Sequence, residues 1–195
     1  MRVVQAFRKL AKNNLLVYSQ TDSAFIDVNT KALLESSGRW ISERVGFNAR
    51  RVLLTEKEIS PQYRVVKIGS DTVEHILYSE QRNVLYGASY LFDYTLLDKT
   101  HSAQTVSFSL VPSASGMGGV KTEVLSAEIF PVHMVRFAST KSEEVDHVEY
   151  SKLYAFAPNN ISINDDMELQ IGGERYLINE SEPELLCIRL ALTKR

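Results

Sequence analysis

The clearest pattern of hydrophobic and polar positions lies close to the end of the chain. From Leu186 to Leu192 every second residue is leucine or isoleucine, and Cys187, Arg189 and Ala191 stand between them. A period of two is typical of a β-strand with one buried face. The pattern therefore predicts a final strand that contributes a row of aliphatic side chains to the core.

The dipeptide Gly172-Gly173 predicts a hairpin ahead of this strand. Two glycines tolerate the positive φ angles that tight two-residue hairpin turns require. A turn at this place pairs Ile171 with Glu174, Leu169 with Tyr176 and Met167 with Ile178. This register puts the apolar pairs on one face, so the chain is expected to end in three antiparallel strands.

Strand patterns also cover much of the chain between residue 61 and this ending. The expected segments are 63–68, 73–79, 84–97 and 105–110. In the third of them Tyr90, Phe92, Tyr94 and Leu96 fall on one face. Their neighbours supply no basic groove, which favours a core stripe over a platform for stacking nucleotide bases.

The composition agrees with a β-rich protein. The chain has 195 residues, 44% of them hydrophobic, and helical periodicity is confined to short segments. We expect an all-β or α+β fold, an antiparallel β-barrel or sandwich with a short N-terminal amphipathic helix and long loops. Residues 1–60 would form the helix and an extension, and residues 61–195 the β domain, either whole or as two halves, 61–111 and 120–195.

The first 20 residues lack acidic side chains and predict a basic amphipathic helix. Val4, Phe7 and Leu10 recur at helical spacing among arginines and lysines. So short a helix is marginal alone in water, so its apolar stripe must dock on something. Packing on its own domain is the simpler outcome. Docking of Val4, Phe7 and Leu10 on a partner subunit is the functional alternative, and a membrane or nucleic acid is a third.

A loop rich in glycine and serine divides the β region. It contains Ser113, Ser115, Gly116, Met117, Gly118 and Gly119, and its serine, alanine and glycine residues offer little to anchor it in a core. We expect a mobile loop that faces a channel or a neighbouring subunit, with an ordinary exposed hairpin loop as the alternative. It is not a phosphate-binding loop, because Val120 separates Gly119 from Lys121 and the following residues are typical of a strand.

No catalytic, cofactor-binding or metal-binding constellation emerges from the sequence. The four histidines are scattered without ligand spacing, and Cys187 is the only cysteine, so neither a zinc cluster nor an internal disulfide is expected. Asp165-Asp166 is better explained as turn chemistry than as a cation site. These observations predict a protein that is not an enzyme and carries no cofactor.

Charge and hydropathy narrow the expected partners. A net charge of −2 and a pI near 6.1 provide no overall field that attracts nucleic acid, so any contact with DNA would be local. No run approaches the about 20 apolar residues of a membrane span. We expect no membrane contact, and a chain that is intracellular or carried in a virion.

The ending has a recognisable order: an aspartate, an apolar strand, Gly-Gly, a strand containing Arg-Tyr, an acidic connection and a final Leu/Ile strand with a basic terminus. Over residues 153–195 this order resembles the small β-barrel head-closure (stopper) and connector proteins of tailed bacteriophages. The resemblance implies a ring-forming virion neck protein that is assembled in the host cytoplasm, retains packaged double-stranded DNA and docks the tail. Its partners would be copies of itself, the portal or adaptor and tail proteins.

The chain departs from these proteins in length, since stopper proteins are commonly near half its size. A tail-terminator, tail-completion or collar role therefore stays open. A rival from another class is a small β-barrel that binds an apolar ligand against Tyr90, Phe92 and Tyr94. A binder should be compact with a lined cavity, whereas a neck subunit should carry extensions that are incomplete without its neighbours.

Overall fold

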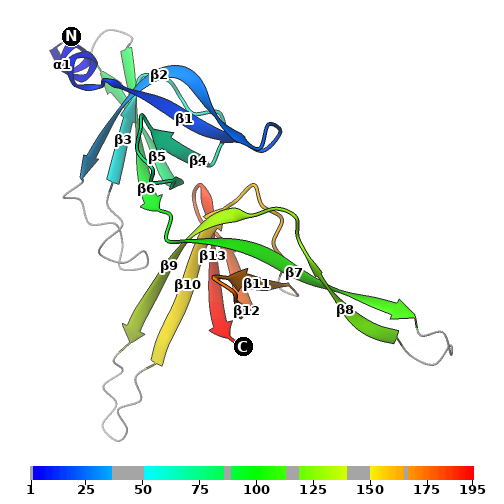
Figure 1. Ribbon diagram of the computed structural model, residues 1–195. Helices are drawn as coiled ribbons and strands as arrows, with labels where there is room; N and C mark the ends of the chain where they lie inside the picture. The colour runs from blue at the N-terminus through cyan, green and yellow to red at the C-terminus, as the bar shows by residue number, and fades with distance from the viewer. Residues whose placement is uncertain (1, 37–50, 86–88, 113–118, 140–149, 165–166) are drawn as a thin grey trace, which may run out of the picture.

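The computed structural model describes residues 2–36, 51–85, 89–112, 119–139, 150–164 and 167–195. They fold into two antiparallel β units (Figure 1), which confirms the expected β-rich class. The first unit contains α1 (Arg2–Leu10), β1 (Asn13–Ser19), β2 (Ala24–Ser36), β3 (Arg51–Thr55), β4 (Val65–Ile68), β5 (His75–Leu85) and β6 (Ser89–Asp98). The second contains β7 (His101–Pro112), β8 (Gly119–Leu125), β9 (Phe130–Ser139), β10 (Tyr150–Pro158), β11 (Glu168–Ile171), β12 (Glu174–Pro183) and β13 (Cys187–Lys194).

The first unit is a closed barrel with the strand order β1-β2-β3-β6-β5-β4, and β4 pairs back with β1. Phe92, Tyr94 and Leu96 of β6 are buried in its core, as their alternation predicted. The Tyr94 hydroxyl accepts a hydrogen bond from the Ile59 backbone N–H at 2.8 Å. The segment after β3 is thereby held against the barrel. The side chain of Tyr90 lies outside the described residues.

The N-terminal helix packs on this first barrel. Phe7 and Ala11 are buried in a small cluster with Leu91 and with the partly buried Leu33 and Leu54. Phe7 therefore belongs to the core of its own chain and is not a partner contact. Of the three outcomes expected for the helix, Phe7 follows the simplest, packing on its own domain, because the β-strands beneath it present apolar side chains.

The second unit also closes on itself. Its order is β11-β12-β13-β10-β9-β7-β8, and β11 pairs in addition with β7 over Ala103–Val106. This pairing joins the two ends of a ring of strands and leaves β8 outside it. We call the two closed units the first and second barrels.

The predicted terminal hairpin is confirmed. Gly172 and Gly173 have φ angles of 60° and 86°, and Ile171 pairs with Glu174 and Leu169 with Tyr176. Along β13 the predicted alternation holds for Leu190 and Leu192, which are buried in the second barrel. Cys187 on the opposite face is buried as well, because the first barrel covers that side.

The division of the chain differs from the sequence prediction. Residues 1–60 are not an extension, since β1, β2 and β3 supply half of the first barrel. The halves 61–111 and 120–195 are also wrong, because β6 ends the first barrel at Asp98 and β7 opens the second at His101. β1 and β2 form a local pair, but β3 pairs with β6, so the barrel depends on a pairing between strands distant in the sequence.

The two barrels meet in a packed junction. Ile76, Tyr78 and Leu97 of the first barrel form one buried cluster with Phe156 and Cys187 of the second. The linking residues are hydrogen-bonded on both sides: the Lys99 N–H donates to Glu74 O at 2.9 Å, and the Thr100 N–H donates to Val132 O at 3.0 Å. This short, bonded linker fixes the barrels relative to each other.

Candidate interaction surface

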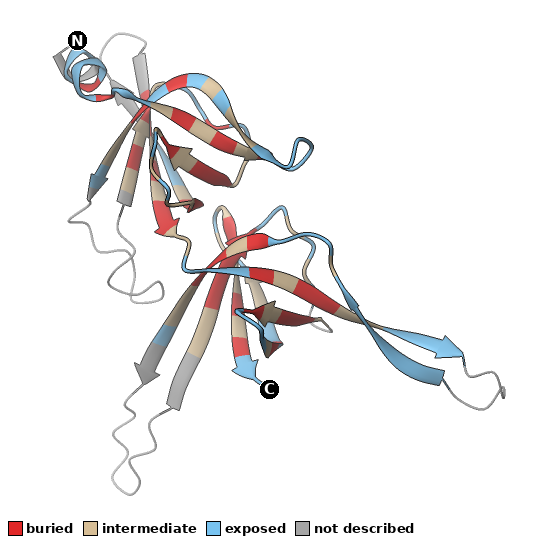
Figure 2. Cartoon of the chain, in the orientation of Figure 1, coloured by how far each residue is buried: buried red, intermediate tan, exposed pale blue. Residues whose placement is uncertain are grey.

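The most unusual surface of the protein is a two-stranded ribbon that leaves the second barrel. It consists of Ser107–Pro112 of β7 and Gly119–Leu125 of β8, and we call it the arm. The arm projects beyond the barrel (Figure 1), and β8 is exposed along its whole length (Figure 2). Exposed strand pairs of this kind have no core of their own to hold them.

The two faces of the arm differ in charge. Residues directly opposite each other in an antiparallel pair share a face. One face carries Ser107, Ser109, Val111, Val120, Thr122 and Val124, and has no charged side chain. The other carries Phe108, Leu110, Lys121 and Glu123, with Leu110 75% exposed. The arm therefore offers apolar side chains on both faces, with an uncharged surface on one.

The backbone edges of the arm are also open. β7 pairs with β11 and β9 only between His101 and Val106, and among the described residues its distal part pairs with β8 alone. The outer edge of β8 has no strand partner within the described ranges either. Free N–H and C=O groups on such edges are ready to pair with another chain.

Local contacts fix the direction in which the arm leaves. Arg175 of β12 contacts Glu123 with 2.8 Å between guanidinium nitrogen and carboxylate oxygen. The Lys121 ammonium lies 3.9 Å from the centre of the Phe108 ring. The first contact ties the ribbon to the second barrel, and the second covers part of Phe108 from within the arm.

A groove of about 730 Å³ opens beside the root of the arm. The β1–β2 turn supplies Gln20 and Ser23, and the segments after β8 and β10 supply Ile129, Asn160 and Ser162. Tyr18 adds an aromatic wall. We call this the inter-barrel groove, because its walls come from both barrels.

The groove combines apolar surface with uncharged polar groups. The Ile129 side chain is 60% exposed, and Tyr18 meets the Phe25 ring edge-on with ring centres 5.4 Å apart. Glu128, the one acidic residue lining it, accepts a hydrogen bond from the Gln20 amide at 3.0 Å. This bond crosses from one barrel to the other and holds the two walls at a fixed spacing.

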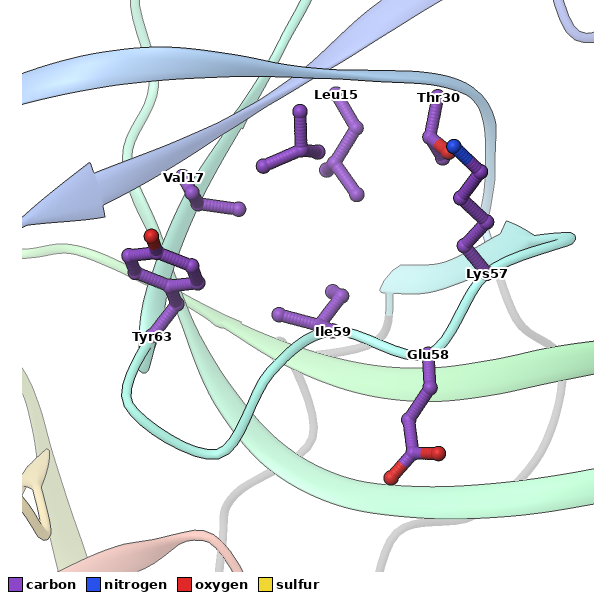
Figure 3. A pocket seen from close by; sticks show the side chains of 8 residues that line it. Leu15, Val17, Thr30, Lys57, Glu58, Ile59 and Tyr63 are labelled. Carbon is purple, nitrogen blue, oxygen red and sulfur yellow. The ribbon is translucent and has the colours of Figure 1, made fainter.

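A second hollow lies at the side of the first barrel (Figure 3). It is lined by Leu15, Val17, Ile59 and Tyr63, with Lys57 at one end. Its volume is about 120 Å³. Ligand sites for small molecules usually occupy about 300–1,000 Å³, so this hollow is too small for most of them.

Two histidines meet at the junction although they are distant in the sequence. The His75 ring nitrogen Nδ1 lies 2.8 Å from the Asp98 carboxylate, and the His133 Nδ1–H donates to the Asp98 backbone carbonyl at 2.7 Å. Burial lowers the pKa of His133 below its ordinary value of 6.5. The neutral imidazole of His133 is favoured there. The contacts of both rings with Asp98 hold the strand end that leads into the linker.

Most of the predicted contact residues cannot be compared with the structure. The side chain of Val4 and the loop residues Ser113, Ser115, Gly116, Met117 and Gly118 lie outside the described residues, as does Asp165-Asp166. Gly119 is described, and it opens β8 opposite Pro112. Of the two predicted helix residues whose side chains are described, Phe7 is buried and Leu10 is 61% exposed.

The sequence predicted a strand at 105–110 and, as one alternative, an exposed hairpin loop after it, but it did not predict that the strand pair would leave the barrel. A signal was present: the apolar residues Leu110, Val111 and Val120 lie close to the loop on both sides. The inter-barrel groove left no local signal, because its walls come from turns more than a hundred residues apart. The same is true of the junction histidines.

The described residues contain neither a candidate metal site nor a membrane-spanning helix. Within those ranges, no group of three or more histidine, cysteine, aspartate or glutamate side chains is placed to hold a metal ion. No helix in the same part of the chain is long and apolar enough to cross a membrane.

Comparison of the chain with protein-family models, with curated proteins and with solved structures found no match.

Proposed function

We propose that this protein is a structural subunit of a homo-oligomeric ring in the neck of a tailed-phage virion. There it would close the head after DNA packaging and present a docking surface for the tail. The arm carries this proposal: a ribbon with open edges and exposed apolar side chains is costly in a solitary protein and useful in an assembly.

The contrast between the arm and the barrels supports an assembly role. Both barrels pair their strand edges internally, so the described edges that remain open belong mainly to strand extensions such as the arm. Natural proteins usually cover or blunt such edges with charge, proline or a bulge. The arm has Pro112, Lys121 and Glu123 on one face. Its other face exposes Val111, Val120 and Val124 without any charge, which favours a face that a neighbour covers.

The resemblance of residues 153–195 to head-closure proteins gives the proposal its particular setting. In a ring, the packed junction would keep each subunit rigid while the arms reach neighbours. The ring would act mechanically by narrowing a channel, and any contact with DNA would be local and non-specific. Terminator, completion and collar proteins occupy neighbouring layers and remain alternatives for the same kind of subunit.

The rival proposal of an apolar ligand held against Tyr90, Phe92 and Tyr94 has less support. Phe92 and Tyr94 are packed inside the first barrel, and the Tyr94 hydroxyl is already occupied by the Ile59 N–H. The neighbouring hollow of about 120 Å³ leaves little room for a ligand. Phe92 and Tyr94 are therefore accounted for as core.

Virus particles assembled without the protein test the proposal. We expect heads that package DNA and then lose it, with free tails accumulating beside tailless heads. Electron microscopy and nuclease sensitivity of the packaged DNA would measure both effects. Particles that retain DNA and carry normal tails would overturn the neck assignment, and so would turnover of a substrate by the purified protein at an ordinary enzymatic rate.

A further inference from the structure

We infer that the arm of one copy docks into the inter-barrel groove of a neighbouring copy. This inference rests on the proposed function, since it names the contact that would build the ring. It goes further in assigning a specific pair of surfaces, both of which belong to this chain.

The arm needs a cover that another strand or groove can supply. A single two-stranded ribbon is marginally stable in water, and this one buries neither face. Its uncharged face presents Val111, Val120 and Val124 between small hydroxyl side chains. Burying that face costs little in desolvation of charge, because there is no charged group on it.

The groove has the matching chemistry. Tyr18 and Ile129 give it an apolar surface for valine side chains. The Gln20 and Asn160 amide nitrogens already donate to Glu128 and to the Gln62 carbonyl, so their amide oxygens and the Ser162 hydroxyl are the partners for an open backbone edge. Its one carboxylate, on Glu128, is already hydrogen-bonded by Gln20. An uncharged ribbon face and a groove with a single, bonded charge suit each other better than either suits a strongly charged partner.

The arm of the same chain cannot fill its own groove. β8 ends at Leu125, and residues 127–129, which follow shortly after, form one wall of the groove. The root of the arm therefore borders the groove while the ribbon runs away from it (Figure 1). The arm that fits this groove therefore belongs to a second copy of the chain.

Such a contact joins two different surfaces, so it is a head-to-tail contact. Repetition gives a closed ring when the rotation between copies closes, and every arm and every groove is then used. The ribbon is roughly 20 Å long and 10 Å wide. The area of one of its faces is therefore well below the about 800 Å² that each partner buries in a stable interface. One contact alone should therefore be weak, and ring closure should strengthen it.

Engineered cysteines test the inference. Val120→Cys in the arm and Ser162→Cys in the groove are made in separate chains, mixed and treated with a short bismaleimide. The native Cys187 does not interfere, because it is fully buried and burial raises the pKa of its thiol to about 12. We expect a crosslinked dimer that forms only when both variants are present.

A matched control replaces the groove cysteine by Asn179→Cys, an exposed position on β12. The control pair should crosslink at least tenfold less. Crosslinking of Val120→Cys with itself would overturn the inference in favour of an arm-to-arm contact. Absence of the arm-groove product both in concentrated protein and in assembled particles would overturn it outright.

The two proposals fail in different ways. If particles without the protein lose DNA but no arm-groove crosslink forms, the neck role stands and this contact is wrong. If the crosslink forms while particles without the protein keep their DNA and tails, the contact stands and the neck role is wrong.

Discussion

β7 passes through two environments within one strand. Its first half lies in the second barrel, where Ala103 and Val106 are fully buried, whereas Leu110 and Val111 in its second half are exposed. The alternation of Val106, Phe108 and Leu110 continues across the change without a break. Burial here is decided by the strands that flank β7 and not by its own pattern.

This difference separates the strands whose edges and apolar faces are covered within the chain from those whose edges and apolar faces stay exposed. In the barrels, strand edges are paired and the apolar face of each strand meets other strands. In the arm, one pair of strands stands by itself. Changes in the barrels should therefore alter stability, and changes in the arm should alter association.

The largest expected effect on stability is in the second barrel. Leu190→Ala should lower the free energy of unfolding by about 2–5 kcal/mol, because it removes buried apolar surface and leaves a cavity. Leu185→Ala is the matched control, since that side chain is 69% exposed and should cost under about 0.5 kcal/mol. Urea unfolding would measure both, and equal losses would contradict the assigned core. Deletion of residues 184–195 should prevent folding.

The helix gives a smaller effect of the same kind. Phe7→Ser should detach α1 from the first barrel at a cost of about 1–3 kcal/mol, because its buried ring is the main anchor. Leu10→Ser should leave the helix in place, since Leu10 points to solvent. Amide hydrogen exchange of residues 2–10 would report detachment. Equal exchange in the two variants would show that Phe7 is not the anchor.

The junction should respond to acid. Burial lowers the pKa of His133, so the unfolded chain takes up a proton more readily than the folded chain below its ordinary pKa of 6.5. The contribution of His133 to stability is full above that pH and declines as the pH falls from 6.5 toward the lower folded value. His133→Gln should reduce this decline, and His101→Gln, at an exposed position, should not. Chemical unfolding at pH 7 and pH 5 would compare them.

Features that depend on residues close together in the sequence could be predicted, and features that depend on distant residues could not. The Gly172-Gly173 turn and the burial of Leu190 and Leu192 on one face of β13 depend on neighbouring residues, and both were predicted correctly. The inclusion of β1 to β3 in a barrel depends on pairings such as that of Leu53 with Tyr94, which no local pattern reveals. The groove and the meeting of His75 with His133 depend on how the two barrels pack, so they also escaped prediction.

The arm should have the smallest effect on stability of any region tested. Phe108 and Glu123 lie directly opposite each other, so residues 109–122 can be replaced by an Asn-Gly turn that keeps the register. The shortened chain should melt within about 2 °C of the full chain, since the part removed buries little. A large loss of melting temperature would mean that the arm belongs to the fold.

Sedimentation equilibrium of the full and shortened chains over rising concentration tests most directly whether the arm exists for association. The full chain should show a weak, concentration-dependent increase in mass, while the shortened chain should remain monomeric. Association of the shortened chain as strong as that of the full chain would show that the arm does not serve association.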